Sequence, residues 1–233
     1  MATDEGGALG LLWSQQRTEK QARPSLSLDL IARAAIEIAD NDGIAAVSMQ
    51  RVAGDLGFTK MSLYRYVTSK AELTAVMIDT AVGEPPDLKQ VTGWRPRMEE
   101  FTRLLAETWS RHPWLPMVTT GNRPMGPNEI GWIDSAVSTL SGTNLTGGER
   151  LAAAFLLFAH VRNTQSAAVA GTGPWTTDTT MGGLIARHGA RFPDLSQAMA
   201  ETGDVLDDNG RRFGLDRIFD GIATLIAQRE GQA

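Results

Sequence analysis

The chain has 233 residues, no cysteine and a formal net charge of −5, and hydrophobic residues make up 42% of it. This composition suits one or two packed globular domains, and it excludes disulfides and thiolate metal sites. No apolar run has the length of a membrane helix and no secretory signal pattern opens the chain, so we expect a cytoplasmic protein with no membrane partner. Residues 17–70 hold eight Lys and Arg against six Asp and Glu, and a mildly basic segment on an acidic remainder is typical of a nucleic-acid-binding module.

The first segment, residues 1–24, is rich in glycine, then carries basic residues and ends at Pro24. This composition predicts a flexible N-terminal tail. Its basic residues also fit a second interpretation, an arm that reaches DNA beside the first helix, and both remain open.

Helix start and stop signals follow in quick succession. Ser27, Ser48, Thr59 and Ser69 each precede a short stretch with apolar periodicity, as N-cap residues do. The spacing predicts a first helix that is ended by Gly43 and in which Ile31, Ala34, Ala35 and Ile38 share a face. It predicts a short second helix before Gly57 and a third helix over Lys60–Tyr66. A fourth helix begins at the Ser69–Glu72 capping box and runs to about Val82.

The rest of the chain also has helical periodicity. We expect helices at roughly 94–111, 114–120, 127–140, 147–170 and 211–229, and a looser segment over 177–205. Long alternating runs of β-branched residues are absent. The sequence therefore predicts an all-α fold.

The segment Ser48–Tyr66 has the layout of a helix-turn-helix, because two short helices are joined by a tight turn at Gly57. On the second helix Leu63 and Val67 would face the core, so Met61 and Arg65 would point away from it. Such a helix can place its outer face in the major groove of DNA. Spacing alone fits an ordinary three-helix bundle equally well.

The string Ser48–Leu73, SMQRVAGDLGFTKMSLYRYVTSKAEL, strongly resembles the DNA-binding domain of the TetR family of repressors. Trp94, Arg111–Trp114, Gly126–Asn128 and Phe213–Gly221 resemble the C-terminal domain of the tetracycline repressor subfamily. The resemblance implies a helix-turn-helix DNA-binding domain over residues 25–72 and a ligand-binding and dimerisation domain over residues 73–233. It also implies DNA contacts by Gln50, Thr59, Lys60, Met61, Ser62, Tyr64, Arg65, Tyr66 and Lys70.

Two of these positions depart from the tetracycline repressor, since Gln50 stands where that relative has an arginine and Arg65 where it has a tryptophan. Glutamine can pair with adenine and arginine with guanine. We therefore expect an operator of different sequence.

Positional likeness to the same relative places several residues near its drug site. Phe101 and Thr119 replace the asparagine and histidine that grip drug and metal there, so we expect an apolar or aromatic small-molecule inducer and no metal cofactor. For the aromatic residues ordinary core filling is the competing interpretation, and for Arg162 and Gln165 it is a salt bridge or an edge position. The candidate ligand residues are Phe101, Leu105, Trp109, Thr119, Asn122, Trp132, Ser135, Arg162, Gln165 and Trp175.

The family resemblance further implies a homodimer that binds palindromic operator DNA and is released by its inducer. The apolar stripe Leu215–Ile226 suits pairing with a second copy, although the same stripe could pack within one chain. A ligand-independent or activating regulator is the alternative. We do not expect an enzyme, because the three histidines are far apart and no nucleophile or phosphate-loop motif occurs.

Overall fold

The computed structural model describes residue 10 and residues 26–169, 180–201 and 210–231. All regular structure in these ranges is helical, which confirms the all-α class. The chain divides into two compact units, one ending at Ser141 and the other beginning at Gly142. Nowhere in the described ranges is there a helix both long and apolar enough to cross a membrane. The predicted tail lies outside them, apart from residue 10.

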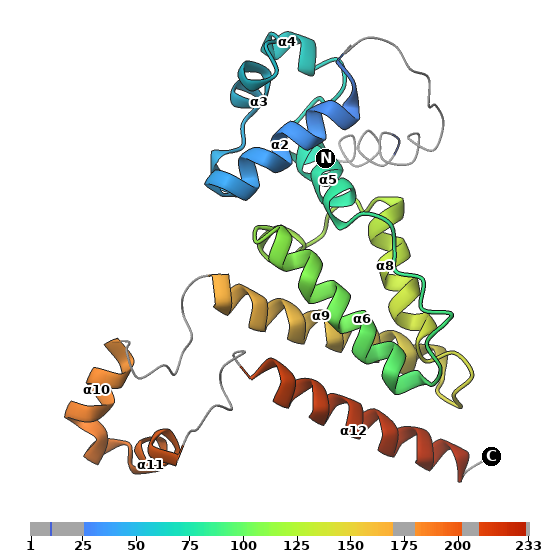
Figure 1. Cartoon of the computed structure of the whole chain (residues 1–233), viewed down its shortest axis with the longest axis vertical. Coiled ribbons are helices and arrows are strands. Elements are labelled where there is room, and N and C mark those ends of the chain that lie inside the picture. Colours follow the sequence, from blue (N-terminus) through green and yellow to red (C-terminus); the bar gives the residue numbers. More distant parts are fainter. Residues whose placement is uncertain (1–9, 11–25, 170–179, 202–209, 232–233) are drawn as a thin grey trace. The chain divides into compact units, whose positions relative to one another are not determined.

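The first unit is a succession of short and medium helices (Figure 1). Helix α2 packs against α3 and α5, α3 packs against α4, and α5 also packs against α8. The elements are α2 (Leu28–Asp42), the 3₁₀ turn η1 (Ile44–Ala46), α3 (Met49–Asp55), α4 (Lys60–Leu63), α5 (Lys70–Val82), α6 (Trp94–Arg111), α7 (Leu115–Val118) and α8 (Pro127–Ser138).

Helix α2 begins and ends as the sequence predicts. The Ser27 hydroxyl accepts from the backbone N–H of Leu30 at 3.1 Å, and Gly43 ends the helix with a φ of 82° that favours glycine. Ile31, Ala35 and Ile38 are buried and Ala34 is half-buried. The buried stripe is wider than predicted, because Ala32, Ile36 and Ala39 are buried as well.

Helix α5 lies at the centre of the first unit. Ala75 and Val76 pack with Ala32 of α2, and Leu28 borders this cluster. Helix α5 packs on α8 as well as on α2, and the compact unit that contains it ends at Ser141.

The second unit contains α9 (Gly147–Val169), α10 (Thr180–His188), η2 (Gly189–Arg191), α11 (Pro193–Glu201) and α12 (Arg211–Glu230). The segment 177–205 is thus more helical than predicted, because Pro193 starts α11 and glycines had masked the periodicity of α10. Helices α9 and α12 pack side by side. They are antiparallel, since Glu149 near the start of α9 pairs with Arg229 near the end of α12 at 2.5 Å.

Candidate nucleic-acid interface and ligand core

A tight turn joins α3 to α4 and orients both helices. Gly57 has a φ of 72°, and the backbone N–H of Phe58 donates to the Ala53 carbonyl at 2.8 Å. A side chain at residue 57 would strain this left-handed backbone. Leu63 and Val67 are fully buried, as the helix-turn-helix pattern predicts, so the opposite face of α4 is turned to solvent.

Helix α4 is shorter than predicted. It ends at Leu63 instead of Tyr66, and the chain continues as a turn in which the backbone N–H of Tyr66 donates to the Leu63 carbonyl at 2.8 Å. This hydrogen bond spans three residues and replaces the α-helical bond from the Tyr66 N–H to the Ser62 carbonyl, so the turn is tighter than an α-helix. Val67 still reaches the core, because its backbone N–H donates to the same carbonyl at 3.0 Å.

The residues predicted to contact DNA lie on the solvent side of these helices. Met61 is 73% exposed although it is a large apolar residue. Three of the set, Ser62, Tyr64 and Tyr66, are half-buried. The fully exposed members are Gln50, Thr59, Lys60, Met61, Arg65 and Lys70.

Two pairs of these side chains contact one another. The Thr59 hydroxyl caps α4 by accepting from the backbone N–H of Ser62 at 3.3 Å, and it lies 2.9 Å from the Ser62 hydroxyl. The Lys60 ammonium lies 5.5 Å from the centre of the Tyr64 ring. By contrast, the side chains of Gln50 and Arg65 have no hydrogen bond or ion pair with the described part of the chain. These two side chains are therefore free for an external partner.

Lys70 is the first residue of α5, where the cap geometry is well defined. The Ser69 hydroxyl accepts from the backbone N–H of Glu72 at 3.1 Å, as the predicted capping box requires. The Glu72 carboxylate accepts from Thr68 at 2.6 Å instead of from Ser69. The exposed Lys70 is thus held at the positive end of a helix, an arrangement that favours a phosphate.

Three candidate ligand residues of α6 lie on its inner face. Phe101, Leu105 and Trp109 are all almost completely buried. Phe101 meets Trp132 of α8 edge to face, with ring centres 5.7 Å apart and an interplanar angle of 61°. Aromatic side chains therefore form the contact between α6 and α8.

Helix α8 is bonded along one face to the end of α5 and the loop after it. The indole N–H of Trp132 donates to the Gly83 carbonyl at 3.2 Å, and the Ser135 hydroxyl donates to the Pro86 carbonyl at 2.8 Å. Trp132 and Ser135 are both predicted ligand residues, and the indole N–H and the hydroxyl are thus already used to attach α8.

Asp79, which sequence reasoning missed, makes the third of these attachments. Its carboxylate accepts from the backbone N–H of Glu129 at 3.0 Å in the first turn of α8, and the Asn128 amide donates to its carbonyl at 3.0 Å. Burial raises the pKa of the Asp79 carboxyl, and hydrogen bonding from the backbone N–H groups of Glu129 and Asn128 offsets part of that rise. The signal in the sequence is a lone acid within the apolar run of α5.

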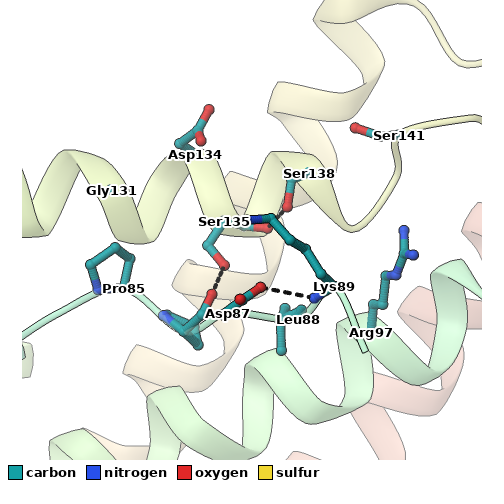
Figure 2. A pocket seen from close by; sticks show the side chains of 11 residues that line it. Pro85, Asp87, Leu88, Lys89, Arg97, Gly131, Asp134, Ser135, Ser138 and Ser141 are labelled. Atoms are coloured by element: carbon teal, nitrogen blue, oxygen red, sulfur yellow. Dashed lines mark hydrogen bonds between the residues drawn. The ribbon is translucent and has the colours of Figure 1, made fainter. Parts of the chain in front are cut away.

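Two cavities lie beside α8 and the loop before α6. One, of about 530 Å³, is lined by Ser135 and by charged residues that include Lys89, Arg97 and Asp134 (Figure 2). The other, of about 500 Å³, is lined by Trp132, Thr108 and His112 among others. Neither is lined by Phe101, Leu105 or Trp109.

The remaining candidate ligand residues lie in three places. Thr119 is half-buried after α7 and donates to the Leu115 carbonyl at 2.8 Å, and Asn122 is exposed in the following bend. Arg162 and Gln165 belong to α9 of the second unit, where Gln165 accepts from Arg211 at 3.1 Å. Trp175 lies outside the described residues.

In the second unit the stripe of α12 faces α9. Phe219, Ile222 and Ile226 are buried there, and the other members of the stripe are half-buried. Helix α9 keeps a second, outer face on which Leu151, Phe155 and Leu156 are 45%, 54% and 51% exposed. The predicted capping box is present, because the Thr146 N–H donates to Glu149 at 2.8 Å and the Glu149 N–H to Thr146 at 3.3 Å.

Two family models match the chain in the order of its parts. Residues 31–77 match the model of bacterial regulatory proteins of the tetR family. Residues 85–226 match the model of the tetracyclin repressor-like C-terminal domain.

Named relatives agree with these models. The HTH-type transcriptional repressor DrrR1 of Streptomyces coeruleorubidus is 33% identical over 246 residues, covering 99% of this chain and 90% of that protein. The structure of apo ActR from Streptomyces coelicolor is similar with a TM-score of 0.75 at 24% identity, covering 91% of this chain and 100% of that one. ActR in complex with actinorhodin has a TM-score of 0.73 at 26% identity, with 87% and 99% covered. The chain therefore belongs to the tetR family of bacterial regulatory proteins and is a DNA-binding transcription regulator, not an enzyme.

Proposed function

We propose that this protein is a homodimeric repressor that binds a palindromic operator through α3 and α4 and is released by a small apolar or aromatic molecule. One observation carries the DNA-binding part. Gln50 and Arg65 project into solvent without partners in the described chain, beside the exposed Met61. They lie in the segment that matches the DNA-binding model of the family.

These side chains supply complementary chemistry. Arg65 can donate two hydrogen bonds to a guanine, Gln50 can pair with an adenine edge, and Met61 offers an apolar surface to a thymine methyl group. Tyr64, Tyr66 and Lys70 flank them and supply hydroxyl and ammonium donors for phosphates. The Lys60 ammonium lies over the Tyr64 ring, so in the proposed complex it would lie near the phosphates that Tyr64 contacts.

The outer face of α9 supports the homodimer. Leu151, Phe155 and Leu156 keep about half of their surface exposed on a helix whose other side already packs on α12. Small or apolar residues, Ala152 and Ala159, continue this exposed face along the helix. A monomer gains nothing from such a stripe, whereas a second copy of α9 and α12 would bury it.

The ligand part rests on the aromatic contact between α6 and α8. Phe101, Trp109 and Trp132 form a buried aromatic core without a charge that would bind a metal-chelating drug, and Trp132 also lines the cavity of about 500 Å³. The relative ActR has been solved with actinorhodin, an observation that favours a polycyclic aromatic ligand class here. A ligand that binds better to the form with displaced DNA-binding helices would release the operator.

The test is a fluorescence-anisotropy titration against the DNA upstream of the protein's own gene, with excess competitor DNA and a stated salt concentration. We expect a Kd on the order of 10⁻⁸–10⁻¹¹ M with one dimer per site. Arg65→Ala is the matched variant, since it removes a candidate base contact from an exposed position. If competitor DNA displaced the wild type and the variant from the upstream DNA equally well, specific binding would be contradicted.

The ligand part is tested on the preformed complex. Actinorhodin and smaller aromatic compounds are added, and we expect at least one to weaken DNA binding roughly 5–150-fold. Retained DNA binding with all of them, in a protein whose melting temperature none of them changes, would contradict ligand release and favour a ligand-independent regulator.

A further inference from the structure

The C-terminal part of α2 is connected to the end of α6 by a junction of three side chains, Asp40, His112 and Trp114. The Trp114 indole N–H donates to Asp40 Oδ1 at 2.7 Å. The His112 Nδ1 lies 3.0 Å from each oxygen of the same carboxylate. The two aromatic rings lie 6.2 Å apart, so a single carboxylate holds both.

Trp114 is withdrawn from water, and the side chains of Asp40 and His112 are partly covered. Trp114 is 1% exposed, and the side chains of Asp40 and His112 are 28% and 17% exposed. Asp29 on the same helix offers a contrast, because it pairs with Arg33 of its own helix and both are more than half exposed. All described hydrogen-bond partners of the Asp40 carboxylate lie outside α2. This carboxylate therefore links α2 to the end of α6 and does not stabilise α2 by itself.

On one side the junction adjoins the candidate ligand core. His112 directly follows α6, and its backbone N–H donates to the Thr108 carbonyl at 3.1 Å, so its position is tied to the last turn of that helix. Trp109, one turn earlier, faces inward with Phe101. A displacement of α6 by a molecule in the core would therefore move His112.

On the other side the junction adjoins the DNA-binding helices. Ala32 of α2 packs against Ala75 and Val76 of α5, and α5 begins with Lys70. A shift of Asp40 is thus passed to α5 by close packing.

Space around the junction allows such a shift. A cavity of about 440 Å³ on the α2 side is lined by Asp40, Thr80, Ala81 and His112. The cavity of about 500 Å³ on the α6 side is lined by Thr80, Ala81 and His112 as well. His112 thus lines two hollows that are open to solvent, so part of its surroundings is not packed protein.

We propose that Asp40, His112 and Trp114 are positioning residues that couple the α6 core to the DNA-binding helices, while touching neither DNA nor ligand. This inference rests on the proposed function. Coupling is reciprocal, so DNA bound at α3 and α4 must alter the α6 end through the same contacts. That reciprocity permits a test without knowledge of the inducer.

The experiment is amide hydrogen exchange of the full chain with and without the upstream DNA. In the wild type we expect DNA to slow exchange at residues 60–72, which contact it, and also at residues 108–118 across the junction. Asp40→Ala and His112→Phe should keep the first effect, with affinity lowered no more than about tenfold, and lose the second. The matched control is Asp29→Asn, which breaks the exposed ion pair on α2 and should keep both effects.

A double variant separates coupling from general loosening. If the two side chains act through one contact, Asp40→Ala with His112→Phe should lower the affinity for the upstream DNA no further than Asp40→Ala alone, whereas independent loosening would lower it by the product of the two single effects. Wild-type remote protection in both single variants, or its loss in Asp29→Asn, would overturn the inference. A wild type protected at residues 60–72 alone would also overturn it. A wild type with no protection at residues 60–72 would instead overturn the proposed DNA-binding function.

Discussion

Helices α5 and α9 are both long and rich in apolar residues, yet they bury these residues differently. Nine of the thirteen residues of α5 are buried. Helix α9 buries Leu157 and Val161 but leaves Phe155 and Leu156 about half exposed. The first unit therefore encloses its central helix, whereas the described part of the second unit leaves an apolar face of α9 exposed.

This difference fits the two tasks proposed for the units. Helix α5 carries Lys70 at one end and Asp79 near the other, and its enclosure suits the proposed transmission of a movement between them. In the proposed homodimer, a second copy covers the outer face of α9. We expect the first unit to control DNA contact and coupling, and the second to control association.

The largest effect is expected from a charge on the outer face of α9. Phe155→Arg should turn the proposed dimer into a monomer and lower affinity for the upstream DNA by at least about a hundredfold, because a monomer contacts one half-site. Light scattering and anisotropy would measure the two losses. Ile130→Arg on α8, 41% exposed, is the control and should leave the mass unchanged. A wild type that is already monomeric would contradict the assignment of this face.

A truncation in each helix sharpens the comparison. Met77 of α5 is fully buried, so Met77→Ala should lower the free energy of unfolding by about 2–5 kcal/mol. Leu151→Ala on α9 removes a side chain that is 45% exposed and should cost less than ~1 kcal/mol in the separated monomer. Urea denaturation of both variants provides the measurement, and equal costs would contradict the difference between the two units.

Loss of a base contact should weaken DNA binding without affecting association. We expect Arg65→Ala to cost about 1–3 kcal/mol in operator binding and to relax specificity at one base pair. Lys70→Gln should weaken binding to all sequences alike and reduce the salt slope by about one. Anisotropy at several salt concentrations distinguishes the two, and a change of dimer mass in either variant would show that the DNA and association functions are not separate.

Asp79 tests the attachment of α5 to α8. Asp79→Ala should lower the free energy of unfolding by about 1–3 kcal/mol, because the Glu129 N–H loses its acceptor. Asp79→Asn keeps an acceptor and removes a buried charge, so it should be more stable than Asp79→Ala at neutral pH. Burial raises the pKa of Asp79 in the folded protein. The stability that Asp79 contributes is therefore complete when the pH is below the pKa of Asp79 in the unfolded chain, and it is lost as the pH rises through the higher pKa of the folded protein. Asp79→Asn should lack this decline in denaturation series between pH 4 and pH 8.

The smallest effect concerns the ion pair between α9 and α12. Hydrogen bonds from Arg229 and Thr146 lower the pKa of Glu149 to about 2. The stability that this group contributes is therefore present above its unfolded pKa and lost as pH falls from about 4.5 towards 2. Glu149→Gln should flatten that part of the stability curve. An unchanged acid transition would mean that the pair does not stabilise the folded protein.

Local signals were sufficient for much of the fold. Hydroxyl caps at Ser27, Ser48, Thr59 and Ser69 are all present, each accepting from a backbone N–H in the first turn of its helix. A cap joins residues three apart and a helical stripe joins residues three and four apart, so a linear pattern contains both. The same pattern predicted which face of α4 is exposed, and with it the side chains available to DNA.

The partners of Asp40 and Asp79 depended on the tertiary structure. Asp40 meets His112 and Trp114 across 72 and 74 residues, and Asp79 meets Glu129 across 50. In the sequence Asp40 looks like an ordinary helical polar residue, and Asp79 stands out only as an acid within an apolar run, because no local spacing relates either to its partners. The use of Trp132 and Ser135 to hold α8 was decided in the same way, by backbone carbonyls 49 residues away that only the folded chain brings within reach. The sequence by itself thus determined the helices and the exposed face of α4, whereas packing decided which polar groups link α2 to the end of α6 and α5 to α8.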